Sequence, residues 1–297
     1  MARGRELFPA DRGLQARMVL AAVVTPLLVF AAIALVVLYA PTRIVVFVAI
    51  AAAVGVGMAI AAYGRSRRAE PVTPAQAPLV HSITERLCAI AALPKPDIYI
   101  DHERQPNSWV VARPRRPAEL HLTQGLIDLL EAHELEAVIG HELAHLANHD
   151  AMVMTVVGGP GAILLEGGAP LMRFGFWGVP PGLVAIAIGW ISRLGTNTLS
   201  RYRELAADAS GVALTGRPSA LATALTKVSG RLDVLPAQDL RAVAGRDAFH
   251  LLPVGEGPQA PWWHKGAGAT HPDVALRIRR LEEMERRLQN ARLPDPH

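Results

Sequence analysis

Residues 138–150 read V-I-G-H-E-L-A-H-L-A-N-H-D, and they contain the pattern His-Glu-x-x-His at His141, Glu142 and His145. Residues four apart on an α-helix lie about one turn apart, so both imidazoles share one face and can hold one Zn²⁺ ion. Glu142 directly follows the first histidine and is placed to act as a general base toward water at that ion. The same pattern can arise by chance, so a third ligand elsewhere in the chain decides its interpretation.

The third ligand is expected in residues 200–211, which read S-R-Y-R-E-L-A-A-D-A-S-G. This stretch is helical by composition, and Gly211 is placed as a C-terminal stop. Glu204 and Asp208 are four apart and share one face. Glu204 would complete a His₂Glu set with an open position, the composition of a catalytic zinc site, and Asp208 could accept the second ring N–H of a ligand histidine. The alternative, a solvated carboxylate pair offset by neighbouring arginines, is less favoured once the stretch is taken together with His-Glu-x-x-His.

The composition points to a membrane protein. Hydrophobic residues make up 51% of the 297 residues, and the mean hydropathy is positive. The formal net charge is only +4, and the arginines are scattered without interleaved aromatic residues, so we expect no nucleic-acid partner. Cys88 is the only cysteine and cannot form an internal disulfide. We expect it to be a small core residue.

Two apolar runs near the N-terminus, residues 18–39 and 44–63, are each long enough to cross a bilayer as a helix. A signal peptide is the competing interpretation, but the first run is too long for a typical signal core and the second follows almost at once. Arginines flank the outer ends of this pair on both sides, at positions 12, 17, 65, 67 and 68. Both ends are therefore expected in the cytoplasm.

A second apolar region follows the His-Glu-x-x-His stretch. We expect two further membrane segments, at residues 152–171 and 174–191, interrupted by glycines and by Pro160 and Pro170 in the former and broken by Pro180-Pro181 in the latter. Glu166 would be expensive in lipid unless it faced protein or water. A re-entrant or interfacial hairpin is the alternative. In either case the site lies close to the bilayer.

Between the two apolar regions the pattern predicts a small sheet and its helices. The expected strands are residues 97–101, 105–112 and 119–123, and the expected helices are residues 79–92, a helix capped by Thr123 and running through Leu130, and one starting at Glu134. Beyond the third ligand, helices are expected at residues 218–231 and 273–288. Residues 107–111 are a candidate edge strand for pairing with an extended substrate, which makes Asn107, Ser108 and Trp109 candidate substrate-binding residues. An ordinary core strand is the alternative.

The chain resembles the HtpX-like membrane zinc metalloproteases, relatives of the CAAX prenyl proteases. The residues that carry the resemblance are His141-Glu142-Leu-Ala-His145 with Asn148 and Asp150, then Arg203-Glu204 and Ala207-Asp208, the pair Pro106-Asn107, and Thr270-His271-Pro272 with Arg277-Ile278 and Leu281. The resemblance implies cleavage of membrane proteins on the cytoplasmic face, often as quality control under stress. It implies that His141, His145 and Glu204 bind one zinc ion, with Glu142 as the base and Asp208 behind the ligands.

Two positions depart from the family pattern. Ser108-Trp109-Val110 stands where a run such as Ala-Phe-Ala is usual, which leaves the substrate preference near the cleft open. His149 stands where a glycine is common, and we assign it no role. The resemblance also suggests that His271 stabilises the oxyanion of the scissile carbonyl, although helix capping by Thr270 or Asp273 explains the local sequence nearly as well.

We therefore expect an α+β membrane protein, mostly helical, with transmembrane helices and a zincin-like catalytic domain that carries a small β-sheet. Its expected parts are a cytoplasmic segment at 1–17, a transmembrane hairpin at 18–64, the first part of the catalytic domain at 65–150, a second hydrophobic hairpin at 151–194, and the second part of the catalytic domain at 195–297. The expected activity is that of a zinc-dependent endopeptidase in the cell (inner) membrane, acting on membrane or misfolded proteins at the cytoplasmic face. The alternatives are a site-specific processing protease for lipidated or tagged proteins and a non-catalytic zinc-stabilised scaffold. Glu142 argues against the scaffold, since a purely structural site has no use for a base.

Overall fold

The structure is a computed structural model of the chain. It describes residues 70–112, 117–232 and 273–292, together with Ala16, Val23, Val24, Leu27, Phe30, Ala31 and Ala34. The expected hairpin at 18–64 and the Gly/Pro-rich stretch before residue 273 therefore lie outside the described residues, apart from isolated positions. The chain divides into two compact units, which we name the sheet unit (Glu70–Ala151 and Ser200–His297, with Met1–Leu14) and the hairpin unit (Met152–Leu199, with Gln15–Ala69).

The sheet unit contains a three-stranded sheet in the order β1-β3-β2. β1 (Asp97–Asp101) runs parallel to β3 (Glu119–Thr123), and β2 (Ser108–Val111) runs antiparallel to β3 on its other side. The predictions for β1 and β3 are confirmed. β2 begins later than the expected residue 105, because Pro106 has no N–H for a ladder and Asn107 is held through the Thr123 side chain. Within the described residues, β2 lies at one edge of the sheet, the position expected for a substrate-pairing strand.

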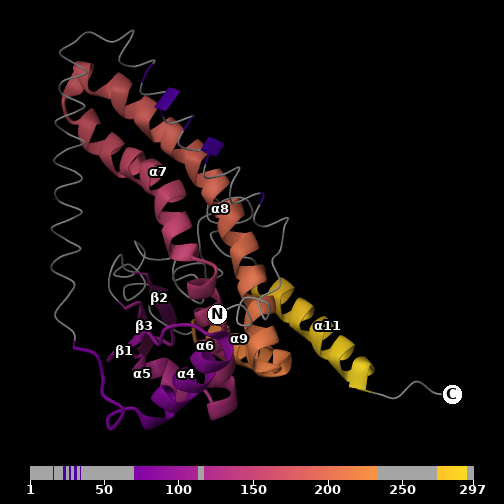
Figure 1. Cartoon of the computed structure of the whole chain (residues 1–297). Helices are drawn as coiled ribbons and strands as arrows, with labels where there is room; N and C mark the ends of the chain where they lie inside the picture. Colours follow the sequence, from indigo (N-terminus) through magenta and orange to yellow (C-terminus); the bar gives the residue numbers. More distant parts are fainter. Residues whose placement is uncertain are drawn as a thin grey trace. The chain divides into compact units, whose positions relative to one another are not determined.

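In the described residues, five complete helices lie in the sheet unit: α4 (Pro78–Ala91), α5 (Gln124–Leu129), α6 (Ala132–Ala147), α9 (Pro218–Leu232) and α11 (Val274–Arg292). The second part of the long helix α8 (Val179–Thr215), from Ser200 onward, also belongs to this unit. α6 packs against α4, α9 and β2, and α11 packs against α9 (Figure 1). Thr123 caps α5 as predicted, because its hydroxyl accepts the N–H of Leu126. Cys88 is buried in the core, as predicted. The sequence-predicted helices of this unit are thus present, with ends that differ by a few residues.

The stretch that carries His-Glu-x-x-His is not one straight helix. α6 begins with a capping box between Glu131 and Glu134 and ends at Ala147. His149 then adopts a left-handed backbone conformation, with φ at 56°, and Asp150 begins the next helix. The chain therefore turns just past the motif, so that Asp150 does not continue the axis of α6.

The hairpin unit contains most of α7 (Asp150–Met172) and the first part of α8 (Val179–Thr215), joined by a short 3₁₀ turn at Gly175–Trp177. The two helices approach closely at glycines: a Cβ on Gly161 would lie 2.4 Å from the hydroxyl of Ser192, and one on Gly168 would lie 2.5 Å from Ile186. Of the helices in the described part of the chain, α8 is the one that is long and apolar enough to cross a membrane. Pro160 and Pro170, which are expected from the sequence to interrupt the first segment, lie inside the continuous helix α7.

Two expectations for this region are wrong. Pro180-Pro181 do not break a segment but lie in the first turn of α8, where proline removes no helical hydrogen bond. Gly211 does not end the ligand helix, which is continuous with the preceding apolar segment and runs on to Thr215 before Gly216 adopts a positive φ of 67°. A hypothetical Cβ on Gly211 would lie 2.9 Å from the backbone nitrogen of His141. Gly211 is thus needed for a close approach between helices rather than for a stop.

Candidate metal centre

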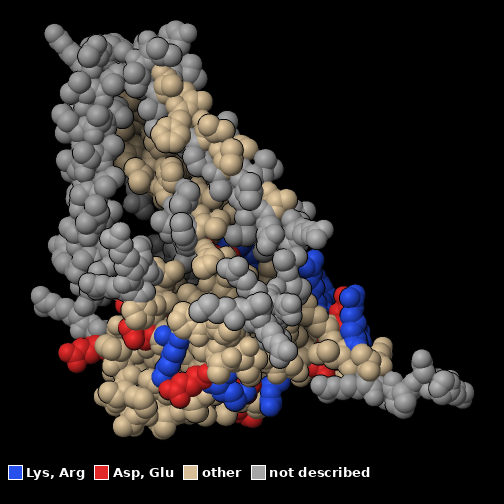
Figure 2. Space-filling model, in the orientation of Figure 1, with Lys and Arg blue, Asp and Glu red and all other residues tan. Residues whose placement is uncertain are grey.

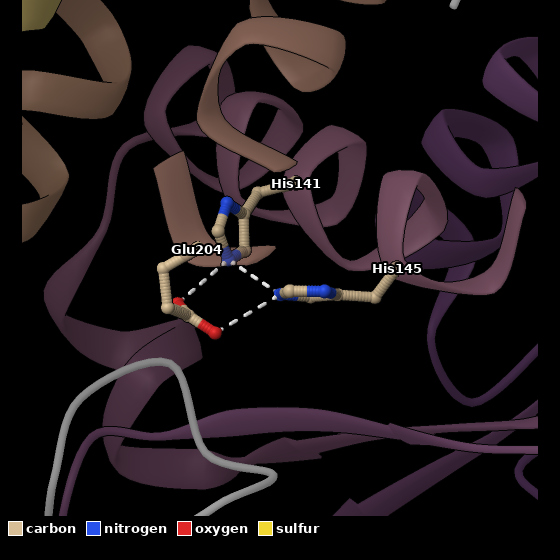
Figure 3. Close-up of side chains that lie close together, drawn as sticks. All are labelled: His141, His145 and Glu204. Carbon is tan, nitrogen blue, oxygen red and sulfur yellow. Dashed lines mark hydrogen bonds and ion pairs between the residues drawn. The ribbon is translucent and has the colours of Figure 1, made fainter. Parts of the chain in front are cut away.

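Three buried side chains converge in the sheet unit from two helices. α6 presents His141 and His145 one turn apart, and α8 presents Glu204 opposite them (Figure 3). The two Nε2 atoms are 3.1 Å apart, and the Glu204 oxygens lie 3.6 Å from His141 Nε2 and 3.4 Å from His145 Nε2. One ligand atom from each residue lies within 4.8 Å of the others. The structure thus brings together the three ligands expected from the sequence.

The approach of α8 to α6 depends on two glycines. Gly211 of α8 lies against the backbone of His141, and a Cβ on Gly140 of α6 would lie 2.6 Å from the methyl carbon of Thr215. A larger residue at either position would push the helices apart. The glycine contact therefore sets the distance across which Glu204 reaches the two histidines.

A carboxylate stands behind each histidine. Asp208 Oδ1 lies 3.0 Å from Nδ1 of His141, and Asp150 Oδ2 lies 2.7 Å from Nδ1 of His145. The first contact is short but poorly directed for a full hydrogen bond. Because an ionised carboxylate only accepts, each Nδ1 is the favoured position for the ring proton. Both Nε2 lone pairs then face the Glu204 carboxylate, and this convergence of acceptor atoms suits a cation.

An arginine in turn stands behind each of these carboxylates. Arg277 donates two hydrogen bonds to Asp208, at 2.8 and 2.7 Å, and Arg203 Nε lies 3.2 Å from Asp150. Among the described residues of the site, four carboxyl groups (Glu142, Glu204, Asp208 and Asp150) face two guanidinium groups, and all six side chains are buried. Buried charge must be compensated. One divalent cation on the two imidazoles and the carboxylate would do so, and this donor set is one that zinc prefers.

Burial shifts the titration of the site. Burial alone would lower the pKa of His141, but its contacts with the Asp208 and Glu204 carboxylates raise the pKa to about 9. The pKa of Glu142 is raised by burial, an effect that the nearby histidines and a hydrogen bond from Ser108 partly oppose. In the absence of a metal, both groups therefore hold a proton more readily than they would in water.

The three candidate substrate-binding residues, at the start of β2, have different surroundings. The Ser108 hydroxyl donates a 2.6 Å hydrogen bond to Glu142 Oε1, and both groups are buried. Trp109, the next residue, stacks on His121 with ring centroids 4.8 Å apart. Asn107 is buried, and its backbone pairs with Thr123 at the start of the strand. Ser108 therefore contacts the site directly, whereas the Trp109 ring belongs to a stack across the sheet.

A model of peptidase family M48 matches residues 74–285, which includes both histidines, Glu204 and Arg277. The chain belongs to peptidase family M48. Similar proteins include Protease HtpX homolog 2 of Methanosarcina acetivorans (36% identical, covering 73% of this chain and 76% of that protein) and a Protease HtpX homolog of Moorella thermoacetica (33% identical, 84% and 87%). The solved structure of S. mikatae Ste24p gives a TM-score of 0.49 at 14% identity, covering 93% of this chain and 66% of that one. The resemblance to HtpX-like proteases and the expectation of a metalloprotease are confirmed.

Within this M48 peptidase, several contacts at the site were not anticipated from the sequence. Asp150 and Arg203 belong to the pattern of the family resemblance, but the sequence predicts no contact of either with His145 or with each other. Arg277, 69 residues from Asp208 along the chain, has no spacing signal at all, although it falls in the C-terminal block of the family resemblance. His271, expected near the oxyanion, lies outside the described residues, so its role stays a prediction.

Proposed function

We propose that this chain is a zinc-dependent endopeptidase, with one zinc ion per chain held by His141, His145 and Glu204. The observation that carries the proposal is the convergence of two imidazole Nε2 atoms and one carboxylate in a buried cluster whose described carboxyl groups outnumber its guanidinium groups. Glu142, one residue after the first ligand, is buried beside the cluster and interacts electrostatically with both histidines. A purely structural zinc site would have four protein ligands, and the described residues offer three.

Each residue of the site has a defined task in peptide hydrolysis. Bound zinc would polarise the scissile carbonyl and make water acidic enough to attack it. Glu142 accepts the proton of the attacking water and delivers it to the leaving amine. Ser108 holds the Glu142 carboxylate from the β2 side through its 2.6 Å hydrogen bond. The edge of β2 not paired with β3 is the place where an extended substrate backbone can add as a strand.

The enzyme is further proposed to work in the cell (inner) membrane, on membrane or misfolded proteins at the cytoplasmic face. Supporting this, α8 is apolar in its first part and continues directly into the turn that carries Glu204, which keeps the site near the bilayer. Two apolar runs near the N-terminus, flanked outside by arginines, favour further spans with both ends in the cytoplasm. Together these features support the proposal of a multi-pass topology.

The test compares the purified full-length protein with its Glu142→Gln variant in detergent. Zinc content and cleavage of an unfolded test protein are measured for both. Equal zinc in the two proteins, with cleavage lost in the variant alone, is the expected result, since glutamine keeps the shape of the side chain but cannot take a proton. The number of cleavage sites separates two substrate classes: many sites indicate a quality-control endopeptidase, and one defined site indicates a processing enzyme. Absence of zinc from the wild-type protein after supplementation would contradict the proposal.

A further inference from the structure

α11 is a strongly polar helix with one inward-facing arginine. Its other described arginine side chains, Arg279, Arg280, Arg286 and Arg287, are exposed. Figure 2 shows basic side chains along this helix. Arg277, by contrast, is fully buried, with an exposed fraction of 0%. A buried arginine is expensive unless its donors are satisfied, so its position calls for a partner that repays the desolvation.

Among the described residues, Arg277 contacts two carboxylates of the proposed metal centre. Its Nε and Nη2 donate to the two oxygens of Asp208, and its Nη1 lies 3.4 Å from Glu204 Oε2. Asp208 in turn contacts Nδ1 of His141. One guanidinium group thus touches a proposed zinc ligand directly and reaches a second one through Asp208. A planar fork with this geometry fixes both position and orientation of a carboxylate, which a lysine ammonium does not.

The same helix is attached to the rest of the sheet unit by apolar contacts one turn away. Leu281, four residues after Arg277, is fully buried, and Ile278 and Met284 pack partly against the same core. The main neighbour of α11 is α9. Docking of the apolar side of α11 and insertion of Arg277 are therefore parts of one event.

We propose that Arg277 is a positioning residue through which docking of the C-terminal helix α11 and zinc binding are thermodynamically linked. The docked helix holds Glu204 and the Asp208–His141 pair in their ligand positions, and bound zinc in turn holds the helix in place. Linkage of this kind is reciprocal: what strengthens one event strengthens the other by the same factor. The inference rests on the zinc site proposed above.

Electrostatics alone would predict the opposite effect on zinc affinity, so the direction of the change in affinity is what the experiment must determine. A guanidinium near a cation repels it, so removal of Arg277 could tighten zinc binding. Removal of Arg277 alone would also leave the Asp208 carboxylate uncompensated near the metal, which adds to this effect. We expect the loss of ligand orientation to outweigh both effects, since groups that orient ligands from behind are worth about 10–100-fold in metal affinity.

The first experiment measures zinc affinity of the full-length protein in detergent, by competition with a chromogenic zinc chelator. Arg277→Met is expected to weaken zinc binding at least about tenfold. Arg279→Met, a matched change at an exposed position of the same helix, is expected to leave it unchanged. Arg277→Lys, which keeps the charge without the fork, should recover only part of the loss. Affinity of Arg277→Met within twofold of the Arg279→Met control, or tighter, overturns the inference.

The second experiment remains informative if Arg277→Met fails to fold. Hydrogen exchange of the α11 amides in the wild-type protein is compared with and without zinc, and zinc affinity is measured for Leu281→Ala, which weakens docking without touching the metal centre. Zinc is expected to slow exchange in α11, and Leu281→Ala to weaken zinc binding. Equal rates of hydrogen exchange in α11 with and without zinc would overturn the proposed linkage. A wild-type protein that binds no zinc would instead contradict the proposed metal site.

Discussion

His149 has an unfavourable backbone conformation that the turn after α6 requires. It follows the end of α6 with a φ of 56°, in the left-handed region that L-residues other than asparagine and aspartate rarely adopt. HtpX-like proteins commonly have glycine at the corresponding position, and the turn explains why. The exposed imidazole gains nothing visible in return. The same turn places Asp150 against His145, and this contact compensates for the backbone strain.

The first prediction is that His149→Gly stabilises the protein. Relief of the left-handed strain is worth about 1–2 kcal/mol, and the added freedom of the unfolded chain removes part of it, which leaves roughly 0.5–1 kcal/mol. Unfolding of the detergent-solubilised protein, followed by circular dichroism, measures the change. Asn148→Gly is the control, since Asn148 has an ordinary right-handed conformation and should lose stability. Destabilisation by both substitutions would contradict the explanation.

The second prediction concerns the proton on His141. With a pKa raised to about 9 from the ordinary 6.5, the ring of the metal-free folded protein is charged at neutral pH. Its contribution to the stability of the metal-free protein is complete below pH 6.5 and is lost as the pH rises through 9. Zinc must displace this proton, so apparent zinc affinity should rise with pH up to about 9 and then level off. Calorimetry of zinc binding at neutral pH in two buffers of different ionisation enthalpy should reveal the released proton, and identical heats would contradict the assignment.

At the scale of elements, local patterns predicted most of the fold. β1 and β3 are predictable because a short run of alternating apolar and polar residues is typical of a strand. α5 is predictable because Thr123 is a strong N-cap. The junction of the apolar segment with the ligand helix was missed, since nothing in the sequence distinguishes a continuous α8 from two helices in register. A glycine can end a helix or allow a second helix to approach closely, and the residue type at position 211 does not distinguish the two roles. Contacts such as Arg277 with Asp208 join distant segments and leave no periodicity to detect.

The third prediction tests that contact between elements. Gly211→Ala places a Cβ 2.9 Å from the His141 nitrogen and 3.0 Å from its Cα, both of them backbone atoms that cannot swing aside. We expect a loss of about 1–3 kcal/mol in stability and weaker zinc binding, because α8 must move away from α6. Gly230→Ala in α9 meets nothing within 4 Å and should stabilise the protein by about 0.5–1 kcal/mol. Thermal unfolding and chelator competition check both, and an equal gain for the two variants would refute the packing role.

At the scale of the whole molecule, the sheet unit is assembled from two separated pieces of chain. Residues 70–151 supply the sheet and two ligands, and the part from residue 200 onward supplies Glu204, Asp208 and Arg277. The apolar α7–α8 segment is inserted between them. If this insertion crosses the membrane and returns, both pieces of the sheet unit emerge on one side. The arginines that flank the N-terminal apolar runs predict that this side is the cytoplasm.

The fourth prediction tests that side and uses the single cysteine of the chain. Burial raises the pKa of the Cys88 thiol to about 11, so at neutral pH it should react very slowly with a maleimide. Ser82→Cys, on the exposed side of α4, supplies a reactive thiol in the sheet unit against this low background. A membrane-impermeant maleimide added to intact cells should leave the variant unlabelled, whereas inside-out membrane vesicles should label it fully. Labelling from outside in intact cells would place the sheet unit on the opposite face, and rapid labelling of the wild-type protein in vesicles would show instead that Cys88 is not buried.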